Sequence, residues 1–297
     1  MNFGEQYISI PPVEKNKNEE FRWMSNDEWD SSIQKKTYFF LSGLPRAGTT
    51  LLGAILEQNP DIYVGATSPV LELLLNFNNS FNLNKTYHAF PKEDFRVRTI
   101  SRIPDDWYSD VDKPIIIDKN HGWTGAMSYA ELLSGNVKII CTVRSILEIL
   151  SSWILLNRKS TNSFIDEDLK RFNLSLTDDN RCELLMKEEY GNVEQSLYAL
   201  KKGFTEYPNC LHLIEYDDLI NDTENIINGI YNFLELPTYK HNYNNIEHIN
   251  LENDLSHGMP EMHKVKSTIS RSENNPVDIL SNNIINKYND LEFWRKK

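Results

Sequence analysis

The chain has 297 residues, of which 40% are hydrophobic and 25% charged, a composition typical of a globular protein with a full hydrophobic core. Its 31 basic and 43 acidic side chains give a formal net charge of −12, which argues against partners bound mainly through nucleic-acid phosphates or anionic lipid. A small anionic ligand is not excluded, because it needs only a few well-placed donors.

The cysteines and the N-terminal residues favour the cytoplasm over a secretory compartment. Cys141, Cys182 and Cys210 are widely spaced, odd in number and without a C-x-x-C pair, which predicts reduced thiols and a cytoplasmic protein. Residues 1–10 lack the basic and apolar regions of a signal peptide. No apolar run approaches the roughly 18–20 residues that a membrane span needs, so we expect no span.

The pattern of apolar residues predicts an N-terminal extension over 1–35 and a single domain over 36–297. In the first half of the domain, short apolar and aromatic runs that resemble strands alternate with loops and with segments of helical spacing. The segment over 78–112 is expected to be irregular. In chain order the first expected elements are a strand at 36–42, a loop at 43–48, a helix at 49–58, a strand at 61–64 and a helix at 69–77.

Two continuous β-branched runs, at 114–118 and 137–143, are typical of strands that are buried on both faces of a parallel sheet. The remaining expected elements are a Ser-capped helix at 145–157, a helical region at 179–204, a strand at 211–216 and a helical region at 217–236. This alternation predicts a three-layer α/β/α domain with a mainly parallel sheet, similar to that of the P-loop nucleotide kinases.

The loop Gly43–Thr50 (GLPRAGTT) lies between a predicted strand and a predicted helix, where backbone amides and a helix N-terminus can cradle a phosphate. Its spacing is that of G-x-x-x-x-G-K-[ST], but Thr49 stands in place of the Lys and Arg46 supplies the basic side chain. An ordinary glycine turn before a helix is the alternative interpretation.

Residues Leu44–Leu51 (LPRAGTTL) resemble the 5′-phosphosulfate loop of sulfotransferases that use 3′-phosphoadenosine-5′-phosphosulfate (PAPS), with Ala47 in place of the usual Ser. The resemblance implies PAPS as cofactor, its product PAP, and no metal. It also implies a set of cofactor-binding residues in this loop: Arg46, Ala47, Gly48, Thr49, Thr50 and Leu51.

A second segment, Asp118–His121 (DKNH), follows a predicted strand and resembles the K-T-H segment of cytosolic sulfotransferases, which implies His121 as catalytic base beside Arg46 and Lys119. Tyrosylprotein sulfotransferases carry a catalytic Glu at the position of Thr67. Because that carboxylate is absent here, Glu72 and Asp118 stay open as alternative bases, and a surface-loop role for His121 is the non-catalytic interpretation.

Further residues match the family's nucleotide contacts. Arg144, at the end of a predicted strand, and Ser152 have the spacing of its 3′-phosphate site, although an ion pair between Arg144 and Glu148 is an alternative. Tyr216 matches a contact to adenine, or is a core residue. A basic cluster that includes His263 matches the loop that covers the 3′-phosphate, or is a solvated loop; its other members are Lys264, Lys266 and Arg271.

The sequence therefore predicts sulfuryl transfer from PAPS to an acceptor hydroxyl, or less favourably an amine. The acceptor is expected to be a small molecule, a glycan or a lipid, bound by segments 76–112 and 158–190; aromatic candidates are Tyr87, Phe90, Trp107 and Tyr108. Two alternatives stay open: an ATP-dependent small-molecule kinase of P-loop type with Asp118 on Mg²⁺, and a non-catalytic nucleotide-binding protein. The oligomeric state is also open.

Overall fold

The computed structural model describes residues 36–160, 162–247, 249, 252–271 and 274–295, and the predicted extension over 1–35 lies outside these ranges. A five-stranded sheet in the order β2-β3-β1-β4-β5 forms the centre, and its strand pairs are parallel. The strands are β1 (Thr37–Gly43), β2 (Ile62–Tyr63), β3 (Ile115–Lys119), β4 (Ile139–Val143) and β5 (Leu211–Glu215).

Strand β1 lies at the centre of the sheet between β3 and β4, with Phe40 opposite Asp118 on one side and Ile139 on the other. Its side chains alternate between the two faces, and Phe40 and Leu41 are fully buried on opposite faces. A strand covered on both faces needs apolar residues at every position, which explains the continuous hydrophobic runs in the sequence.

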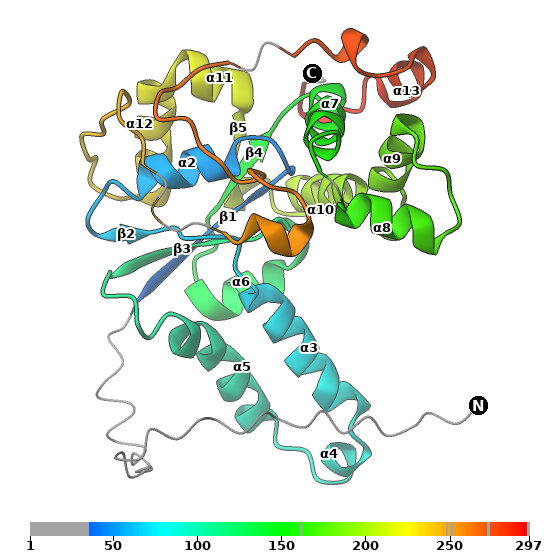
Figure 1. Cartoon of the computed structure of the whole chain (residues 1–297). Helices are drawn as coiled ribbons and strands as arrows, with labels where there is room; N and C mark the ends of the chain where they lie inside the picture. Colours follow the sequence, from blue (N-terminus) through cyan, green and yellow to red (C-terminus); the bar gives the residue numbers. More distant parts are fainter. Residues whose placement is uncertain (1–35, 161, 248, 250–251, 272–273, 296–297) are drawn as a thin grey trace, which may run out of the picture. The chain divides into compact units, whose positions relative to one another are not determined.

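Helices cover both faces of the sheet (Figure 1). Leu52 and Ile55 of α2 and Ile230 of α12 pack on one face, and Ile149 of α7 and Leu200 of α10 belong to the core on the other. The prediction of a three-layer α/β/α fold is confirmed. The helices are α2 (Thr49–Leu56), α3 (Val70–Leu83), α4 (Lys85–Ala89), α5 (Glu93–Trp107), α6 (Met127–Ser134), α7 (Ile146–Asn157), α8 (Phe164–Arg171), α9 (Asp178–Leu185), α10 (Asn192–Glu206), α11 (Tyr216–Asn221), α12 (Thr223–Leu234) and α13 (Asn282–Tyr288).

The expectation of an irregular segment over 78–112 is wrong, because α3 continues through it and α4 and α5 follow. Asn84 caps α4 by accepting a hydrogen bond from the Tyr87 amide at 3.0 Å. Helix α5 packs beside α3 and buries Ile100 and Pro104. The sequence pattern did not predict this helix, because it has few apolar residues and an internal proline, Pro104. The packing of α5 against α3 stabilises the helix despite these two unfavourable features.

Among the described residues, no helix combines the length and the apolar character needed to cross a bilayer. Cys141, Cys182 and Cys210 are free thiols, and the first two are buried. Cytoplasmic location stays a prediction.

Candidate active site

The loop after β1 depends on glycine at both of its ends. Gly43 has φ +112°, and a Cβ there would lie 2.1 Å from the Thr142 carbonyl oxygen of the neighbouring strand β4. Gly48 has φ +90°, and a Cβ there would lie 2.8 Å from the Tyr216 ring. Arg46 between them has φ 62°, a left-handed conformation that side chains other than glycine seldom adopt. The sequence therefore folds into a tight loop that is seated against β4 and Tyr216.

The loop leads directly into α2, which begins at Thr49. The first hydrogen bond within the helix runs from the Leu52 amide to the Gly48 carbonyl at 2.9 Å, so the amides of Thr49, Thr50 and Leu51 precede it. These are the groups that bind anions at helix N-termini. Ala47 differs from its neighbours, because its side chain is fully buried in the core and its amide donates to the Leu44 carbonyl at 3.3 Å.

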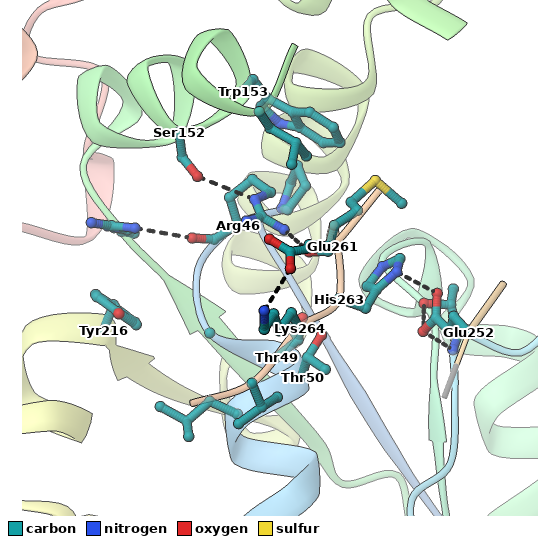
Figure 2. Close-up of a pocket in the computed structure, with 18 of the residues that line it drawn as sticks. Arg46, Thr49, Thr50, Ser152, Trp153, Tyr216, Glu252, Glu261, His263 and Lys264 are labelled. Carbon is teal, nitrogen blue, oxygen red and sulfur yellow. Dashed lines mark hydrogen bonds and ion pairs between the residues drawn. The ribbon is translucent and has the colours of Figure 1, made fainter. Parts of the chain in front are cut away.

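A cavity of about 980 Å³ opens above this loop and brings together residues from across the chain. Figure 2 shows the loop residues in the middle, with Tyr216 on one side and Glu252 and His263 on the other. Ala47 and Arg271 are the two predicted site residues that do not line it. The predicted residues that line it are Arg46, Gly48, Thr49, Thr50, Leu51, Lys119, His121, Arg144, Ser152, Tyr216, Lys264 and Lys266.

Arg46 points from the loop toward α7 and the C-terminal part of the chain (Figure 2). Its Nε donates to Ser152 Oγ at 3.2 Å, one of its terminal nitrogens donates to the Met262 carbonyl, and its guanidinium lies 5.8 Å from the centre of the Trp153 ring. Burial and the neighbouring Arg144 both lower the pKa of Arg46. The side chain nevertheless stays cationic, because an arginine starts from so high a pKa.

Arg144, at the end of β4, is almost fully buried beside the loop. Its guanidinium lies 4.3 Å from the centre of the Tyr216 ring, donates to the Arg46 carbonyl at 3.4 Å and forms an ion pair with Glu148 at 3.5 Å. The ion pair named as an alternative therefore exists, together with a position on the cavity wall. An anion that binds Arg144 would share the guanidinium with Glu148.

His121 also lines the cavity, directly after β3. Its Nδ1 lies 2.9 Å from the Gly43 carbonyl oxygen, which accepts only, so Nδ1 carries the proton and Nε2 of the neutral ring keeps its lone pair. Burial lowers the pKa of His121 to about 4, opposed by the Gly43 hydrogen bond and reinforced by the charge of Lys119. The ring is therefore neutral at pH 7, with an unprotonated Nε2.

The two alternative bases lie away from the cavity. Asp118 is buried beneath the sheet end, where it accepts hydrogen bonds from the Tyr108 hydroxyl at 2.6 Å and from Trp123 Nε1 at 2.7 Å. Glu72 lies on α3 and accepts from Asn120 at 3.0 Å. Neither carboxylate lines the cavity, and both accept hydrogen bonds from neighbouring side chains; their roles as bases stay predictions.

A carboxylate that sequence reasoning missed lies in the cavity wall. Glu252 Oε1 accepts from Lys119 Nζ at 2.8 Å and from the Thr67 amide at 2.7 Å, and Glu252 Oε2 lies 3.0 Å from His263 Nδ1. Burial opposes the charge, but hydrogen bonds from His263 and Lys119 and the charge of Lys119 hold the pKa of Glu252 well below its usual range. No motif surrounds this residue, so only the fold could reveal it.

The basic cluster near the C-terminus divides in the structure. Lys264 pairs with Glu261 at 2.5 Å and Lys266 donates to Ser270 at 3.0 Å, and both lysines line the cavity. Arg271 instead pairs with a half-buried carboxylate of α11, Asp217, at 3.1 Å. Arg271 does not line the cavity, and its contact with the nucleotide stays a prediction.

The aromatic residues expected on the acceptor side lie outside this cavity, and their contact with an acceptor stays a prediction. Tyr87 is in α4, Phe90 follows α4, Trp107 ends α5, and the Tyr108 hydroxyl donates to Asp118. Apolar cavity residues come instead from α7, α8 and the C-terminal segment: Trp153, Leu155, Leu156, Phe164, Met262 and Val265. Of the expected segment 158–190, Lys159 and Phe164 line the cavity.

Comparison with known proteins now identifies the family, since a model of the sulfotransferase family matches residues 39–240. The chain belongs to the sulfotransferase family. Protein-tyrosine sulfotransferase A of Caenorhabditis elegans is 21% identical over 248 residues, which cover 76% of this sulfotransferase and 61% of the relative. The chain thus spans about 61% of that relative's length.

Solved structures similar to this chain include two that are named as sulfotransferases. The sulfotransferase domain of the Synechococcus PCC 7002 olefin synthase has a TM-score of 0.45 at 17% identity, covering 83% of this chain and 88% of that domain. Mouse sulfotransferase SULT7A1, solved with PAP, has a TM-score of 0.42 at 17% identity, covering 73% of this chain and 65% of the mouse chain.

Proposed function

We propose that this sulfotransferase moves a sulfuryl group from PAPS to an acceptor hydroxyl. The observation that carries the proposal is one cavity lined by the glycine loop, by a histidine with a free ring nitrogen and by cations from three strand ends, in a chain of this family. The cations are Arg46, Lys119 and Arg144. A multiply charged nucleotide fits such a donor set, even though the whole protein is acidic.

The residues present fit PAPS by their chemistry. The amides of Thr49, Thr50 and Leu51 and the Arg46 side chain would hold the 5′-phosphosulfate. Arg144 and Ser152 would hold the 3′-phosphate, since a guanidinium and a hydroxyl supply several donors to one phosphate. Tyr216 would contact the adenine. Lys264 and Lys266 would close the cavity from the C-terminal side.

When bound, PAPS would supply an activated sulfuryl group. His121 Nε2 would accept the proton of the acceptor hydroxyl, while Nδ1 keeps its proton on the Gly43 carbonyl. Arg46, Lys119 and the helix amides would stabilise negative charge that develops on oxygen at the loop. Stabilising this charge needs hydrogen-bond donors that do not have to move during the reaction. Arg46 is held by the loop, Lys119 by the end of β3 and the amides by the start of α2.

Transfer of a sulfuryl group fits these residues better than transfer of a phosphoryl group. Thr49 stands where P-loop kinases carry the phosphate-binding Lys. Asp118, the carboxylate that could hold Mg²⁺, is engaged by Tyr108 and Trp123 away from the cavity. Lys119 and the arginines can supply the positive charge that Mg²⁺ provides in kinases.

The acceptor and the compartment are also proposals. Trp153, Leu156, Phe164 and Met262 give one part of the cavity wall an apolar, aromatic character, which favours an acceptor with an aromatic or aliphatic body, such as a small molecule or a lipid, over a bare glycan. The free thiols support a reducing compartment such as the cytoplasm.

The test is incubation of the protein with [³⁵S]PAPS and a panel of phenols, aliphatic alcohols, lipids, glycans, amines and tyrosine peptides. Transfer of label to any hydroxyl acceptor, with release of PAP, supports the proposal. Binding of PAP without transfer to any acceptor would identify a nucleotide-binding protein. Failure to bind PAP, together with Mg²⁺-dependent binding of ATP, would overturn the proposal in favour of a kinase.

A further inference from the structure

Glu252 joins two parts of the molecule that are distant in sequence. It begins the C-terminal segment 252–271, which we call the covering segment, and its side chain is 10% exposed. Its Oε1 accepts hydrogen bonds from Lys119 Nζ at 2.8 Å and from the Thr67 amide and hydroxyl at 2.7 and 3.0 Å. Figure 2 shows its carboxylate beside His263 at the cavity wall.

The ammonium of Lys119 needs this partner. The Lys119 side chain is 4% exposed, and a buried cation without a counter-charge is strongly unfavourable. Glu252 supplies the counter-charge from 133 residues further along the chain. The same oxygen also accepts a hydrogen bond from the backbone amide of Thr67. Thr67 forms an isolated parallel β-bridge with Lys119. Lys119 and Thr67 therefore both hold the Glu252 carboxylate at the end of the sheet. The carboxylate in turn determines where the Lys119 ammonium lies in the cavity wall.

Glu252 also fastens the covering segment. Its Oε2 lies 3.0 Å from His263 Nδ1, while Asp254 accepts from the His263 amide at 3.0 Å and from its ring at 2.6 Å. The chain between these residues thus closes into a loop. Met262, next to His263, accepts a hydrogen bond from Arg46. The contacts of Glu252 and of Arg46 therefore hold one end of the covering segment against the body of the protein.

The hydrogen bonds of Glu252 decide between a role as a base and a role in positioning. Donors from Lys119, Thr67 and His263 surround the carboxylate and keep it ionised. A carboxylate with so many donors has little affinity for a further proton, so it is a poor acceptor for the proton of a substrate. It is well suited to holding the groups that surround it.

We infer that Glu252 is a positioning residue, which orients the Lys119 ammonium in the cavity and anchors the covering segment over the bound nucleotide. The inference rests on the proposed function for the identity of that nucleotide, whereas the anchoring itself can be measured on the protein alone. It assigns a catalytic consequence to a residue outside every motif of the sequence.

The test compares Glu252→Gln with Glu252→Asp, which keeps the charge, and with a matched control, Glu247→Gln. Glu247 is an exposed carboxylate in the same region, outside the cavity, that accepts a hydrogen bond from Asn245. Lys119→Ala and the double variant Lys119→Ala/Glu252→Gln complete the set. The measurements are the affinity for PAP by calorimetry and amide hydrogen exchange of residues 252–271.

Glu252→Gln is expected to speed exchange in the covering segment and to weaken PAP binding, each by about tenfold, because buried donors lose part of their charged partner. Glu252→Asp should recover most of the affinity, and Glu247→Gln should match the unaltered protein. The double variant should bind PAP no more weakly than the weaker single variant, because both changes remove one shared contact.

Unchanged exchange and equal or tighter PAP binding in Glu252→Gln would overturn the inference, since loss of a negative charge alone favours an anion. Additive losses in the double variant would also overturn the coupling to Lys119. If the unaltered protein does not bind PAP, the proposed function fails instead, and hydrogen exchange in Glu252→Gln still decides whether Glu252 anchors the segment.

Discussion

The Nδ1 atom of His121 lies 2.9 Å from the carbonyl oxygen of Gly43, the residue at which β1 ends and the glycine loop begins. The contact joins the candidate base to the candidate phosphate loop through one hydrogen bond. It leaves Nε2 as the ring atom that can accept a proton, because Nδ1 must donate to a carbonyl.

Replacing His121 should separate binding from turnover. In His121→Ala, transfer from [³⁵S]PAPS is expected to fall by about 100-fold or more, the usual loss when a general base is removed. His121→Asn, which can still donate to Gly43, should lose as much transfer while it keeps the loop in place. Calorimetry should give PAP affinities close to that of the unaltered protein for both. Full transfer in either variant would remove His121 from the mechanism.

The low pKa of His121 predicts how stability depends on pH. Burial lowers that pKa from 6.5 to about 4, so between these values the unfolded chain binds a proton that the folded chain does not. Stability therefore falls as the pH falls from about 6.5 to about 4, by about 3 kcal/mol from this group. Denaturant titrations over this range should show the fall in the unaltered protein. The fall should be smaller by this amount in His121→Asn; an identical pH dependence would contradict the buried, neutral ring.

Arg144 should dominate nucleotide affinity among the cations of the chain. Arg144→Met is expected to weaken PAP binding by about 100-fold, because hydrogen bonds to charged groups contribute about 1.5–3 kcal/mol each. Arg144→Lys should lie between, since an ammonium cannot form the two-pronged contact. Lys201→Met, on the exposed face of α10, is the control and should leave the affinity unchanged. Equal effects at both positions would argue for a diffuse electrostatic attraction.

Gly48 should tolerate no side chain. Gly48→Ala combines a left-handed φ of +90° with a Cβ 2.8 Å from the Tyr216 ring, so it should destabilise the fold by about 1–3 kcal/mol and displace Tyr216. Gly135→Ala is a matched control, because Gly135 has φ +68° and nothing within 4 Å of the added atom. A larger loss of PAP affinity at Gly48 than at Gly135, measured by calorimetry, would show that the Tyr216 contact matters. Equal losses of stability would refute the clash.

Much of the fold follows from local patterns in the sequence. The runs that became β1, β3 and β4 are apolar at nearly every position because helices cover both faces of the sheet, and this pattern alone indicates parallel strands. Helix α5 was hidden because its stability comes from packing on α3 rather than from its own residues. Local patterns report burial reliably and report packing between helices poorly.

Some residues of the candidate site could be predicted from the sequence, and others could not. The glycine loop, Lys119, His121 and Arg144 sit at strand ends, where parallel sheets bring side chains together, so motifs could predict them. Glu252 could not be predicted, because its role depends on a contact across 133 residues. Asp118 has the type of residue and the position of a catalytic group, yet Tyr108 and Trp123 engage it in the core. Residue type at a strand end does not settle which way a side chain points.

Beside the Lys119–Glu252 pair, two further cations of the cavity hold carboxylates: Arg144 is paired with Glu148, and Lys264 with Glu261. An anion that binds Arg144 or Lys264 would compete with these carboxylates, so its net gain would be the difference between the new contacts and any that it displaces. A chloride or a single sulfate can replace only one partner at a time and gains little. In the proposed complex, a nucleotide with phosphates at both ends would engage Arg144 and the loop together, so the paired carboxylates would favour it over small anions.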